Sequence, residues 1–506
     1  MKLRQLLQSV STLEVEGSLD REITGLAYDS RRVTPGTLFV ALKGQNTDGH
    51  NYIEDAIERG AAAVICERDG FPTAHTTMIV VADSRESMAR AATAFYENPS
   101  SKLKVIGVTG TNGKTTVSFL VKEMLLAAGI KTGLLGTIRY EIGDRVIPAA
   151  RTTPEALEIQ QMLAQMVRSG CEACVMEVSS HALDQQRTLG VEFDVAIFTN
   201  LTQDHLDYHG TMDGYFAAKM KLFTALQHGE KKGAAVVNID DAYGQRLHRE
   251  QDVAVKLTYG LGQSAQLRAH DIELRQDRTI FNLETDGKQL RFEMPLIGRY
   301  NIYNALAAIG AATTLNISWK LIQKALRKMS PVPGRLERVS ANESFNIFVD
   351  YAHTGDALEQ VLKTVREVTE GRLLLLFGCG GSRDVGKRAK MGEVAARLAD
   401  YTLITNDNPR RESPSHIAGQ IQEGYRLVRD DNFGMELDRR RAIEDIINMA
   451  RPGDTVLIAG KGHETYQEFD DTVFPFDDRV IARDALAARA LREQTRSGSR
   501  LDCLLV

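Results

Sequence analysis

The chain has 506 residues, and at about 150 residues per domain that length predicts three domains. Hydrophobic residues make up 43% and charged residues 25%, which excludes a wholly disordered chain. The net charge of −5 provides no overall positive field, so we expect no nucleic-acid partner. Residues 1–20 lack the apolar run of a signal peptide, and the longest apolar stretches, such as Leu373–Phe377, have strand length. We therefore expect a cytoplasmic protein that does not insert into a membrane.

Residues 1–100 are predicted to form a small α/β domain that ends in the turn-rich segment 97–102. A helix is expected at Tyr52–Arg59. Short buried strands are expected at Leu38–Leu42, Ala62–Cys66 and Met78–Val81.

Residues 101–333 are predicted to form a second domain. It begins with a β-branched strand at Lys104–Thr109, and Val117, Leu120, Val121, Met124 and Leu125 then fall on one face of a helix. Further strands are expected at Ala173–Val178, Val195–Thr199 and Ala234–Asn238. This alternation predicts a mostly parallel, doubly wound sheet with helices on both faces.

Residues 334–506 are predicted to form a third, Rossmann-like α/β domain. Helices are expected at Lys387–Leu398 and Arg440–Met449. Strands are expected at Asn346–Asp350, Leu373–Phe377, Tyr401–Thr405 and Thr455–Ala459. Because ligands bind at the carboxyl ends of such strands, we expect the chemistry in the segments that follow them.

A glycine-rich segment between the first strand and helix of the second domain predicts a phosphate-binding loop. Its residues are Gly110, Thr111, Asn112, Gly113, Lys114, Thr115 and Thr116. Backbone N–H groups and the positive helix end suit the phosphates of ATP, which Lys114 is expected to neutralise. The Thr115 hydroxyl is expected to bind Mg²⁺. The segment departs from the strict GxxxxGK[ST] pattern at Val108, where that pattern has glycine.

Two more strand ends carry groups that suit a magnesium ion. Glu177 closes one predicted strand, and His205 lies in the segment that follows another. Mg²⁺ prefers oxygen ligands, and the sequence has no HExxH arrangement that would indicate zinc. The sequence therefore predicts a site in which Glu177 and His205 join Thr115.

Lys219 and a pair of cysteines show no sign of a functional role when their sequence surroundings are considered alone. Lys219 is interpreted as an exposed helix lysine. An ammonium group beside Mg²⁺ is repelled, so Lys219 at the metal site would either bind phosphate directly or be chemically altered. Cys171 and Cys174 form a lone CxxC, which is interpreted as two buried thiols at the start of a strand.

Eight segments resemble the Mur ligases, a family of ATP-dependent enzymes that add amino acids to a cell-wall precursor. They are TGTNGKTT at 109–116, RTTP at 151–154, MEVSSHALDQQR at 176–187, TNLTQDHLDYHG at 199–210, YFAAK at 215–219, YNIYNALAA at 300–308, PGRLE at 333–337 and DYAHT at 350–354. The resemblance spans nearly the whole chain. It implies an N-terminal domain that binds the UDP-linked precursor, a central ATP-binding ligase domain and a C-terminal domain that binds the amino acid.

The resemblance also implies roles for individual residues. Lys219 is expected to be carboxylated to a carbamate, an anionic Mg²⁺ ligand, and to be catalytic together with Lys114, Glu177 and His205. Asn301, Arg335 and Asp350 match positions around the nucleotide. The residues that match those around the UDP-precursor are Ser30, Gln45, Asn46, Thr47, Thr152, Thr153, Ser179, Gln185 and Arg187.

Two loops of the third domain bear on the amino acid. Arg383 and Arg410 follow predicted strands and offer planar forks suited to a carboxylate. Diaminopimelate carries a distal carboxylate that lysine lacks, and the DNPR segment resembles the diaminopimelate-adding branch of the family. In that branch Gly460 and Glu464 contact the amino acid. The expected set is Arg383, Asp407, Asn408, Pro409, Arg410, Gly460 and Glu464.

The resemblance implies that ATP and Mg²⁺ activate the D-glutamate carboxylate of UDP-N-acetylmuramoyl-L-alanyl-D-glutamate as an acyl phosphate, which meso-diaminopimelate then attacks. The expected partners are these small molecules, and the expected state is a monomer. Three alternatives remain at this point: a folylpolyglutamate synthetase, a P-loop switch or motor, and a scaffold that binds nucleotide without catalysis.

Overall fold

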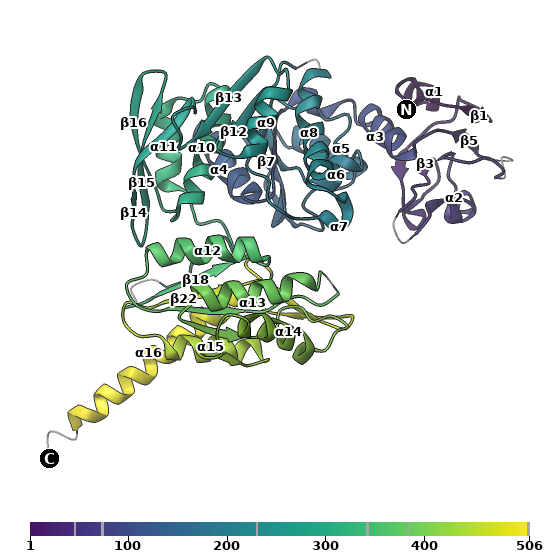
Figure 1. The fold of residues 1–506 in the computed structure, drawn as a ribbon. Coiled ribbons are helices and arrows are strands. Elements are labelled where there is room, and N and C mark those ends of the chain that lie inside the picture. Colours follow the sequence, from purple (N-terminus) through teal and green to yellow (C-terminus); the bar gives the residue numbers. More distant parts are fainter. Residues whose placement is uncertain (45–46, 72–74, 229–230, 341–343, 383, 503–506) are drawn as a thin grey trace. The chain divides into compact units, whose positions relative to one another are not determined.

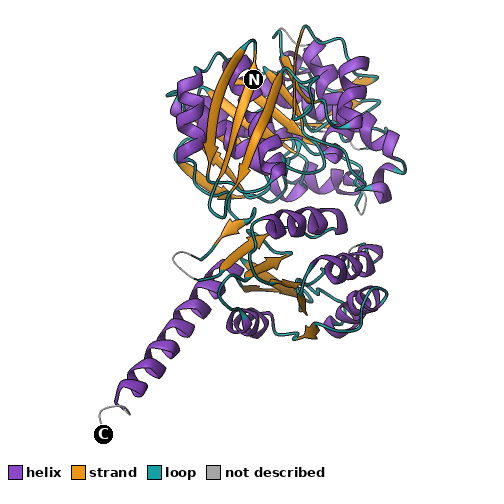
Figure 2. Cartoon of the chain, turned by 60° about the vertical axis from the view of Figure 1, so that its left-hand side comes forward, coloured by secondary structure: helices purple, strands orange, loops and turns teal. Residues whose placement is uncertain are grey.

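The computed structural model describes residues 1–44, 47–71, 75–228, 231–340, 344–382 and 384–502 (Figure 1). The chain is a mixed α/β protein with N-terminal, central and C-terminal domains built around parallel sheets. Its contacts divide it into two compact units, residues 1–268 with 303–325 and residues 269–302 with 326–506. Figure 2 shows helices on both sides of the strands in each unit. None of the helices among the described residues has the length and apolar character needed to cross a membrane.

The N-terminal sheet belongs to the first unit and has the strand order β1-β5-β4-β3-β2. Its strands are β1 (Glu14–Glu16), β2 (Gly25–Ala27), β3 (Thr37–Val40), β4 (Ala63–Cys66) and β5 (Thr77–Val80). Helices α2 (Ile53–Glu58) and α3 (Ser84–Phe95) accompany it. The three predicted strands and the predicted helix are confirmed to within two residues.

The central sheet of the first unit is parallel from β13 to β7, in the order β13-β12-β11-β6-β10-β7, and continues into antiparallel β8 and β9. Its strands are β6 (Lys104–Thr109), β7 (Thr132–Leu135), β8 (Arg139–Ile142), β9 (Arg145–Pro148), β10 (Ala173–Glu177), β11 (Val195–Phe198), β12 (Ala234–Asn238) and β13 (Val255–Gly260). After β6 the chain first adds β7 and β10 on one side of β6, and then adds β11, β12 and β13 on the other side. The loop after β6 therefore lies at the switch point, where ligands bind in such sheets.

Helices pack around this sheet on both faces. They are α4 (Lys114–Ala127), α5 (Ala156–Arg168), α6 (Ser180–Asp184), α7 (Leu206–His209), α8 (Met212–His228) and α9 (Ala242–Glu250). The five apolar residues predicted to share one face of the first helix are all buried in α4. Cys171 and Cys174 are free, buried thiols in the core, so that interpretation is confirmed.

A segment after β13 links the two units along the chain. It contains β14 (Leu267–Leu274), the hairpin of β15 (Thr279–Thr285) and β16 (Lys288–Met294), α10 (Arg299–Thr314) and α11 (Trp319–Lys328). The sequence analysis did not anticipate the hairpin.

The sheet of the second unit has the order β17-β18-β22-β19-β20-β21 and is parallel except for β17. Its strands are β17 (Glu337–Arg338), β18 (Asn346–Asp350), β19 (Leu373–Phe377), β20 (Tyr401–Ile404), β21 (Phe433–Met435) and β22 (Thr455–Ala459). The helices are α12 (Gly355–Glu367), α13 (Gly386–Leu398), α14 (Pro414–Arg426), α15 (Arg439–Met449) and α16 (Asp478–Asp502), and a separate hairpin joins β23 (Tyr466–Phe469) to β24 (Thr472–Pro475). The four predicted strands and both predicted helices are confirmed within one residue at each end.

Candidate active site

The loop between β6 and α4 has the backbone of a phosphate cradle. Gly110 (φ 146°) and Gly113 (φ 89°) adopt positive φ, and a Cβ on Gly113 would lie 2.3 Å from Asn304 Oδ1. Lys114 Nζ donates to the carbonyls of Gly110 (2.9 Å) and Thr111 (2.8 Å). The loop also bonds to the segment after β11, where the Asn112 backbone N–H donates to Asn200 Oδ1 (3.0 Å). Asn112 is half-buried, while Thr116 lies buried in the first turn of α4.

Glu177, at the end of β10, is buried beside this loop, and its carboxylate is the shared acceptor for several neighbouring groups. Its carboxylate accepts hydrogen bonds from Thr115 Oγ1 (3.0 Å), the Thr137 backbone N–H (2.9 Å) and Thr137 Oγ1 (2.9 Å). The structure therefore brings Thr115 and Glu177 together as predicted, and adds Thr137, which the sequence analysis missed. Thr137 follows β7 closely, so the rule that polar residues follow strand ends could have marked it as a candidate, although not as a partner of Glu177.

Lys219 lies on α8 and is buried, with 1% of its surface exposed. Its Nζ donates to the Gly110 carbonyl (2.9 Å), which Lys114 also uses, and lies 4.5 Å from the centre of the Tyr215 ring. Burial, with the charge of Lys114, places the pKa of Lys219 well below its ordinary value. The prediction of an exposed helix lysine is wrong, because Lys219 shares the buried stripe of α8 with Tyr215 and Leu222.

His205 lies in an aromatic cluster at the start of α7. Its ring centre is 4.8 Å from that of His181 and 6.0 Å from that of Tyr215. Burial, with the charges of His181, Lys114 and Lys219, lowers the pKa of His205 to about 4, so its imidazole is neutral at neutral pH. A neutral imidazole is the form that binds a metal.

The predicted magnesium ligands offer a fitting donor set. Thr115 and Glu177 present oxygens, and a carbamate on Lys219 would add more. The described residues hold no group of three or more His, Cys, Asp and Glu side chains that could bind a metal ion. The predicted set includes only two of those types, Glu177 and His205.

A second cluster adjoins Glu177 through β10. Thr153 Oγ1 donates to the Glu177 carbonyl (2.8 Å) and accepts from the Ser179 backbone N–H (3.0 Å). Arg187 donates to the Thr153 carbonyl (3.0 Å) and to Gln185 Oε1 (2.7 Å). Thr152 Oγ1 lies 3.1 Å from Thr137 Oγ1. The structure thus gathers the five central-domain residues that were matched to the UDP-precursor.

The buried carboxylate of Glu155 organises the positive charge of this cluster. It pairs with Arg187 (3.2 Å), with Arg85 of the N-terminal domain (3.4 Å) and with Arg151. The sequence analysis missed Glu155, Arg85 and Arg151.

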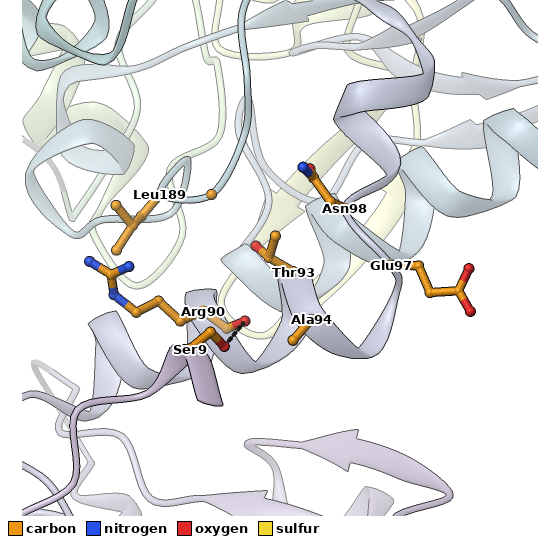
Figure 3. A pocket seen from close by; sticks show the side chains of 8 residues that line it. Ser9, Arg90, Thr93, Ala94, Glu97, Asn98 and Leu189 are labelled. Atoms are coloured by element: carbon orange, nitrogen blue, oxygen red, sulfur yellow. Dashed lines mark hydrogen bonds between the residues drawn. The ribbon is translucent and has the colours of Figure 1, made fainter. Parts of the chain in front are cut away.

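The remaining precursor candidates lie in the N-terminal domain. Ser30 is buried in a short turn after β2, and Thr47 is exposed, its carbonyl accepting from the Gly44 N–H (2.9 Å). Gln45 and Asn46 lie outside the described residues. A cavity of about 310 Å³ also borders this domain, between α3 and Leu189–Gly190 (Figure 3). None of the residues that line this cavity is a predicted site residue.

Three candidates for nucleotide binding belong to the second unit. Asp350, at the end of β18, accepts from the backbone N–H groups of Leu336 (2.6 Å) and Ala352 (2.7 Å), and burial raises its pKa. The Arg335 guanidinium lies 4.6 Å from the centre of the Tyr351 ring. Asn301 Nδ2 donates to the Ile297 carbonyl (2.9 Å).

The loops after β20 and β22 meet around Lys461, whose side chain is fully buried. Its Nζ donates to Asn408 Oδ1 (2.9 Å) and Glu464 Oε2 (3.1 Å) and lies 3.9 Å from Asp407 Oδ1. Burial raises the pKa of Glu464. Gly460 has φ 110°, and a Cβ there would lie 2.6 Å from Asp407 Oδ2. The sequence analysis missed Lys461, although it lies in the segment GKGHE at 460–464, between two residues that were predicted to contact the amino acid.

Arg410 lies beside this group and is held by the β23–β24 hairpin. Its Nε donates to Glu468 Oε2 (2.8 Å) and its Nη1 to the Gly381 carbonyl (2.8 Å). The Pro409 carbonyl accepts from the Glu412 backbone N–H (3.1 Å) and closes the turn. Arg383 lies outside the described residues.

Comparisons with known proteins match the chain along its length. Three family models match: "Mur ligase family, catalytic domain" at residues 22–96, "Mur ligase middle domain" at 108–312 and "Mur ligase, glutamate ligase domain" at 334–462. A protein of Syntrophomonas wolfei is 44% identical over 97% of this chain and 100% of its own length. The chain belongs to the Mur ligase family. Every segment that carried the resemblance lies within residues covered by these matches or directly beside them.

Two further relatives of this Mur ligase support the assignment. A protein of Geobacter metallireducens is 45% identical over 98% of this chain and 100% of its own length. It and the Syntrophomonas protein are both named UDP-N-acetylmuramoyl-L-alanyl-D-glutamate–2,6-diaminopimelate ligase. A solved structure with the same name is 32% identical, has a TM-score of 0.70 and covers 97% of this chain and 99% of its own.

Proposed function

We propose that this Mur ligase joins meso-diaminopimelate to UDP-N-acetylmuramoyl-L-alanyl-D-glutamate, with hydrolysis of ATP to ADP and phosphate. The observation that carries the proposal is that one chain holds two separate sites: a phosphate cradle beside the buried Glu177 carboxylate, and third-domain loops that present Arg410 and Glu464. The first suits acyl-phosphate chemistry, and the second suits an amino acid with a distal carboxylate and ammonium group.

The phosphate loop supplies the activation step in this proposal. Its backbone N–H groups and Lys114 hold the ATP phosphates. Thr115, Glu177, His205 and the Lys219 carbamate would hold Mg²⁺, which would supply charge stabilisation to the transferring phosphoryl group. Asn301, Arg335 and Asp350 are proposed to contact the nucleotide. Once the D-glutamate carboxylate is an acyl phosphate, the amine of the amino acid attacks it, and phosphate leaves as the amide forms.

Lys219 is proposed to act as a carbamate. Carbamate formation requires the neutral amine, and the buried Nζ of Lys219 shares one carbonyl with the cationic Nζ of Lys114. Both burial and the neighbouring charge favour the neutral form. The amine nitrogen attacks CO₂ and releases one proton, which converts the neutral amine into a carbamate anion beside Lys114 and removes the repulsion.

The UDP-precursor is proposed to bind along the first unit. Thr152, Thr153, Ser179, Gln185 and Arg187 are proposed to hold its diphosphate and sugar-peptide, while Ser30, Gln45, Asn46 and Thr47 hold the uridine end. Hydroxyl groups and a guanidinium suit a diphosphate. The domain division at 1–100, 101–333 and 334–506, a monomeric state and a cytoplasmic location remain part of the proposal.

The amino acid is proposed to bind in the second unit against Asp407, Asn408, Pro409, Arg410, Gly460 and Glu464, with Arg383. A lysine side chain ends in an ammonium group, which Arg410 repels, whereas diaminopimelate offers a carboxylate.

The test is the release of ADP by purified protein with ATP, the dipeptide precursor and an amino acid. We expect release that needs both substrates and is far faster with meso-diaminopimelate than with L-lysine or L-ornithine. Release without an amine acceptor would favour a P-loop switch, and release with folate and glutamate would favour a folylpolyglutamate synthetase. The Arg410→Ala variant should keep ATP binding and lose selection of the amino acid.

A further inference from the structure

The backbone of Arg410 is fixed by the neighbouring β23–β24 hairpin. The Arg410 N–H donates to the Glu468 carbonyl (3.1 Å), and the Asp470 N–H donates to the Arg410 carbonyl (2.8 Å). Arg410 has φ 52°, in the left-handed region that costs a non-glycine residue about 1 kcal/mol. These two backbone bonds stabilise that conformation, so the direction in which the side chain leaves the loop depends on the hairpin.

The side chain of Arg410 is fixed by the same hairpin and by the loop after β19. Glu468 accepts from Nε at 2.8 Å and the Gly381 carbonyl accepts from Nη1 at 2.8 Å, on two different edges of the guanidinium. The Arg410 and Glu468 side chains are only 20% and 28% exposed. Hydrogen bonds from two different nitrogens, Nε and Nη1, fix the plane of the guanidinium group. The third nitrogen, Nη2, takes part in neither bond.

The adjacent Arg411 provides an internal comparison, because it pairs with Asp471 of the same hairpin at 2.8 Å. The Arg411 and Asp471 side chains are 73% and 77% exposed. An ion pair so open to water contributes little, because solvent screens it and both side chains stay mobile. The Arg410–Glu468 and Arg411–Asp471 pairs thus join the same loop to the same hairpin with the same charges, and they differ in how deeply they are buried.

We propose that Glu468 is a positioning residue that holds the Arg410 guanidinium in the plane required by the distal carboxylate of the amino acid. This inference rests on the proposed function. A planar fork discriminates a carboxylate from other groups only when its orientation is fixed before binding. Glu468 therefore sets how strongly the site prefers a diamino diacid over a diamino monoacid, by acting through Arg410.

The experiment compares steady-state kinetics of the wild type, Glu468→Gln and the matched control Asp471→Asn. For Glu468→Gln we expect the KM for meso-diaminopimelate to rise about tenfold, as for the loss of one charged hydrogen bond. The kcat and the KM values for ATP and the dipeptide precursor should stay within about twofold, since a binding interaction common to ground and transition states is lost. Asp471→Asn should match the wild type in every constant.

A double-mutant cycle separates positioning from a general structural role. If Glu468 acts through Arg410, Arg410→Ala with Glu468→Gln should be no worse for diaminopimelate than Arg410→Ala alone. Additive losses, equal losses for all three substrates, or a Glu468→Gln variant that behaves like Asp471→Asn would each overturn the inference alone. A wild type without diaminopimelate-dependent ADP release would instead overturn the proposed function, and the inference with it.

Discussion

Asp478→Asn tests how the amino-acid loops are held in place. Arg439, at the start of α15, is fully buried and donates to Asp478 Oδ1 (2.8 Å) and Oδ2 (2.7 Å). The same guanidinium donates to the carbonyls of Asn406 and Ala459, each at 2.9 Å. Those carbonyls stand directly before the DNPR and GKGHE segments. One buried cation thus ties both loops to the first turn of α16.

The cost of the substitution follows from the burial of both partners. Asparagine keeps the size of Asp478 but removes its charge, and the Arg439 guanidinium stays protonated. Breaking a fully buried ion pair by removing one partner costs about 3–5 kcal/mol. With a urea slope of about 2 kcal/mol per M, the unfolding midpoint of the second unit should fall by about 2 M. Replacing both residues, as Arg439→Met with Asp478→Leu, should recover much of that loss.

The single tryptophan allows urea unfolding of the first unit to be followed separately from that of the second. Trp319 belongs to the first unit, whereas far-UV circular dichroism reports helices of both. Urea unfolding of Asp478→Asn should shift part of the dichroism transition and leave the Trp319 fluorescence transition unchanged. The control is Asp431→Asn, which removes an exposed pair with Arg429 and should leave both unfolding transitions where the wild type has them, because solvent screens that pair. An unshifted dichroism curve, or an equal shift in the control, would refute the reasoning.

Three further outcomes are expected. Lys219→Arg, which keeps a cation but cannot form the carbamate, should lose at least about 100-fold in kcat and lack the ¹³C carbamate signal that labelled bicarbonate gives with the wild type. Gly113→Ala should slow ATP turnover, because its Cβ would lie 2.3 Å from Asn304 Oδ1 and the loop or the Asn304 side chain would have to shift. Gly129→Ala, with φ 79° and nothing within 4 Å of the added Cβ, should cost about 1 kcal/mol of stability and leave turnover intact. A hydrogen bond from Arg388 lowers the pKa of Glu412 to about 2, below its unfolded value, so Glu412 stabilises the fold above pH of about 4.5 and loses that effect as the pH falls towards about 2. The difference in unfolding free energy between wild type and Glu412→Gln should therefore shrink from about pH 5 to about pH 3, and a constant difference would contradict it.

The buried parallel strands could be predicted because short apolar runs between turn signals have few other structures open to them. Asn346–Asp350, Leu373–Phe377 and Thr455–Ala459 agree with the structure at both ends. The hairpin of β15 and β16 was missed because polar residues interrupt both strands and β16 is partly exposed, so neither strand forms an apolar run. Apolar continuity therefore identifies the strands that are covered on both faces, and not those covered on one.

Lys219 shows how a local pattern can mislead at a functional position. A lysine on a helix is usually exposed, yet Lys219 is four residues after Tyr215 and three before Leu222, on the stripe that α8 buries. A charged residue on a buried stripe contradicts the helix pattern, and such conflicts are expected where a site requires them. The position of Lys219 on the buried face of α8 was thus a better guide to its burial than its residue type.

Side-chain contacts that depend on the spatial order of the strands could not be predicted from short sequence patterns. The sequence shows that Glu177 and Thr115 follow strands, and a parallel sheet places such residues on one edge. It does not show that β7 lies next to β10, which is what allows Thr137 to bond to the Glu177 carboxylate. Likewise, Glu468 is 58 residues from Arg410 along the chain, and only the folded hairpin brings it to Nε. Residues that bind a ligand often belong to a sequence motif and can be recognised from it. The residues that orient them can lie anywhere in the sequence, because only the fold brings them into contact. For this reason Glu468 beside Arg410 and Thr137 beside Glu177 could be identified only from the structure.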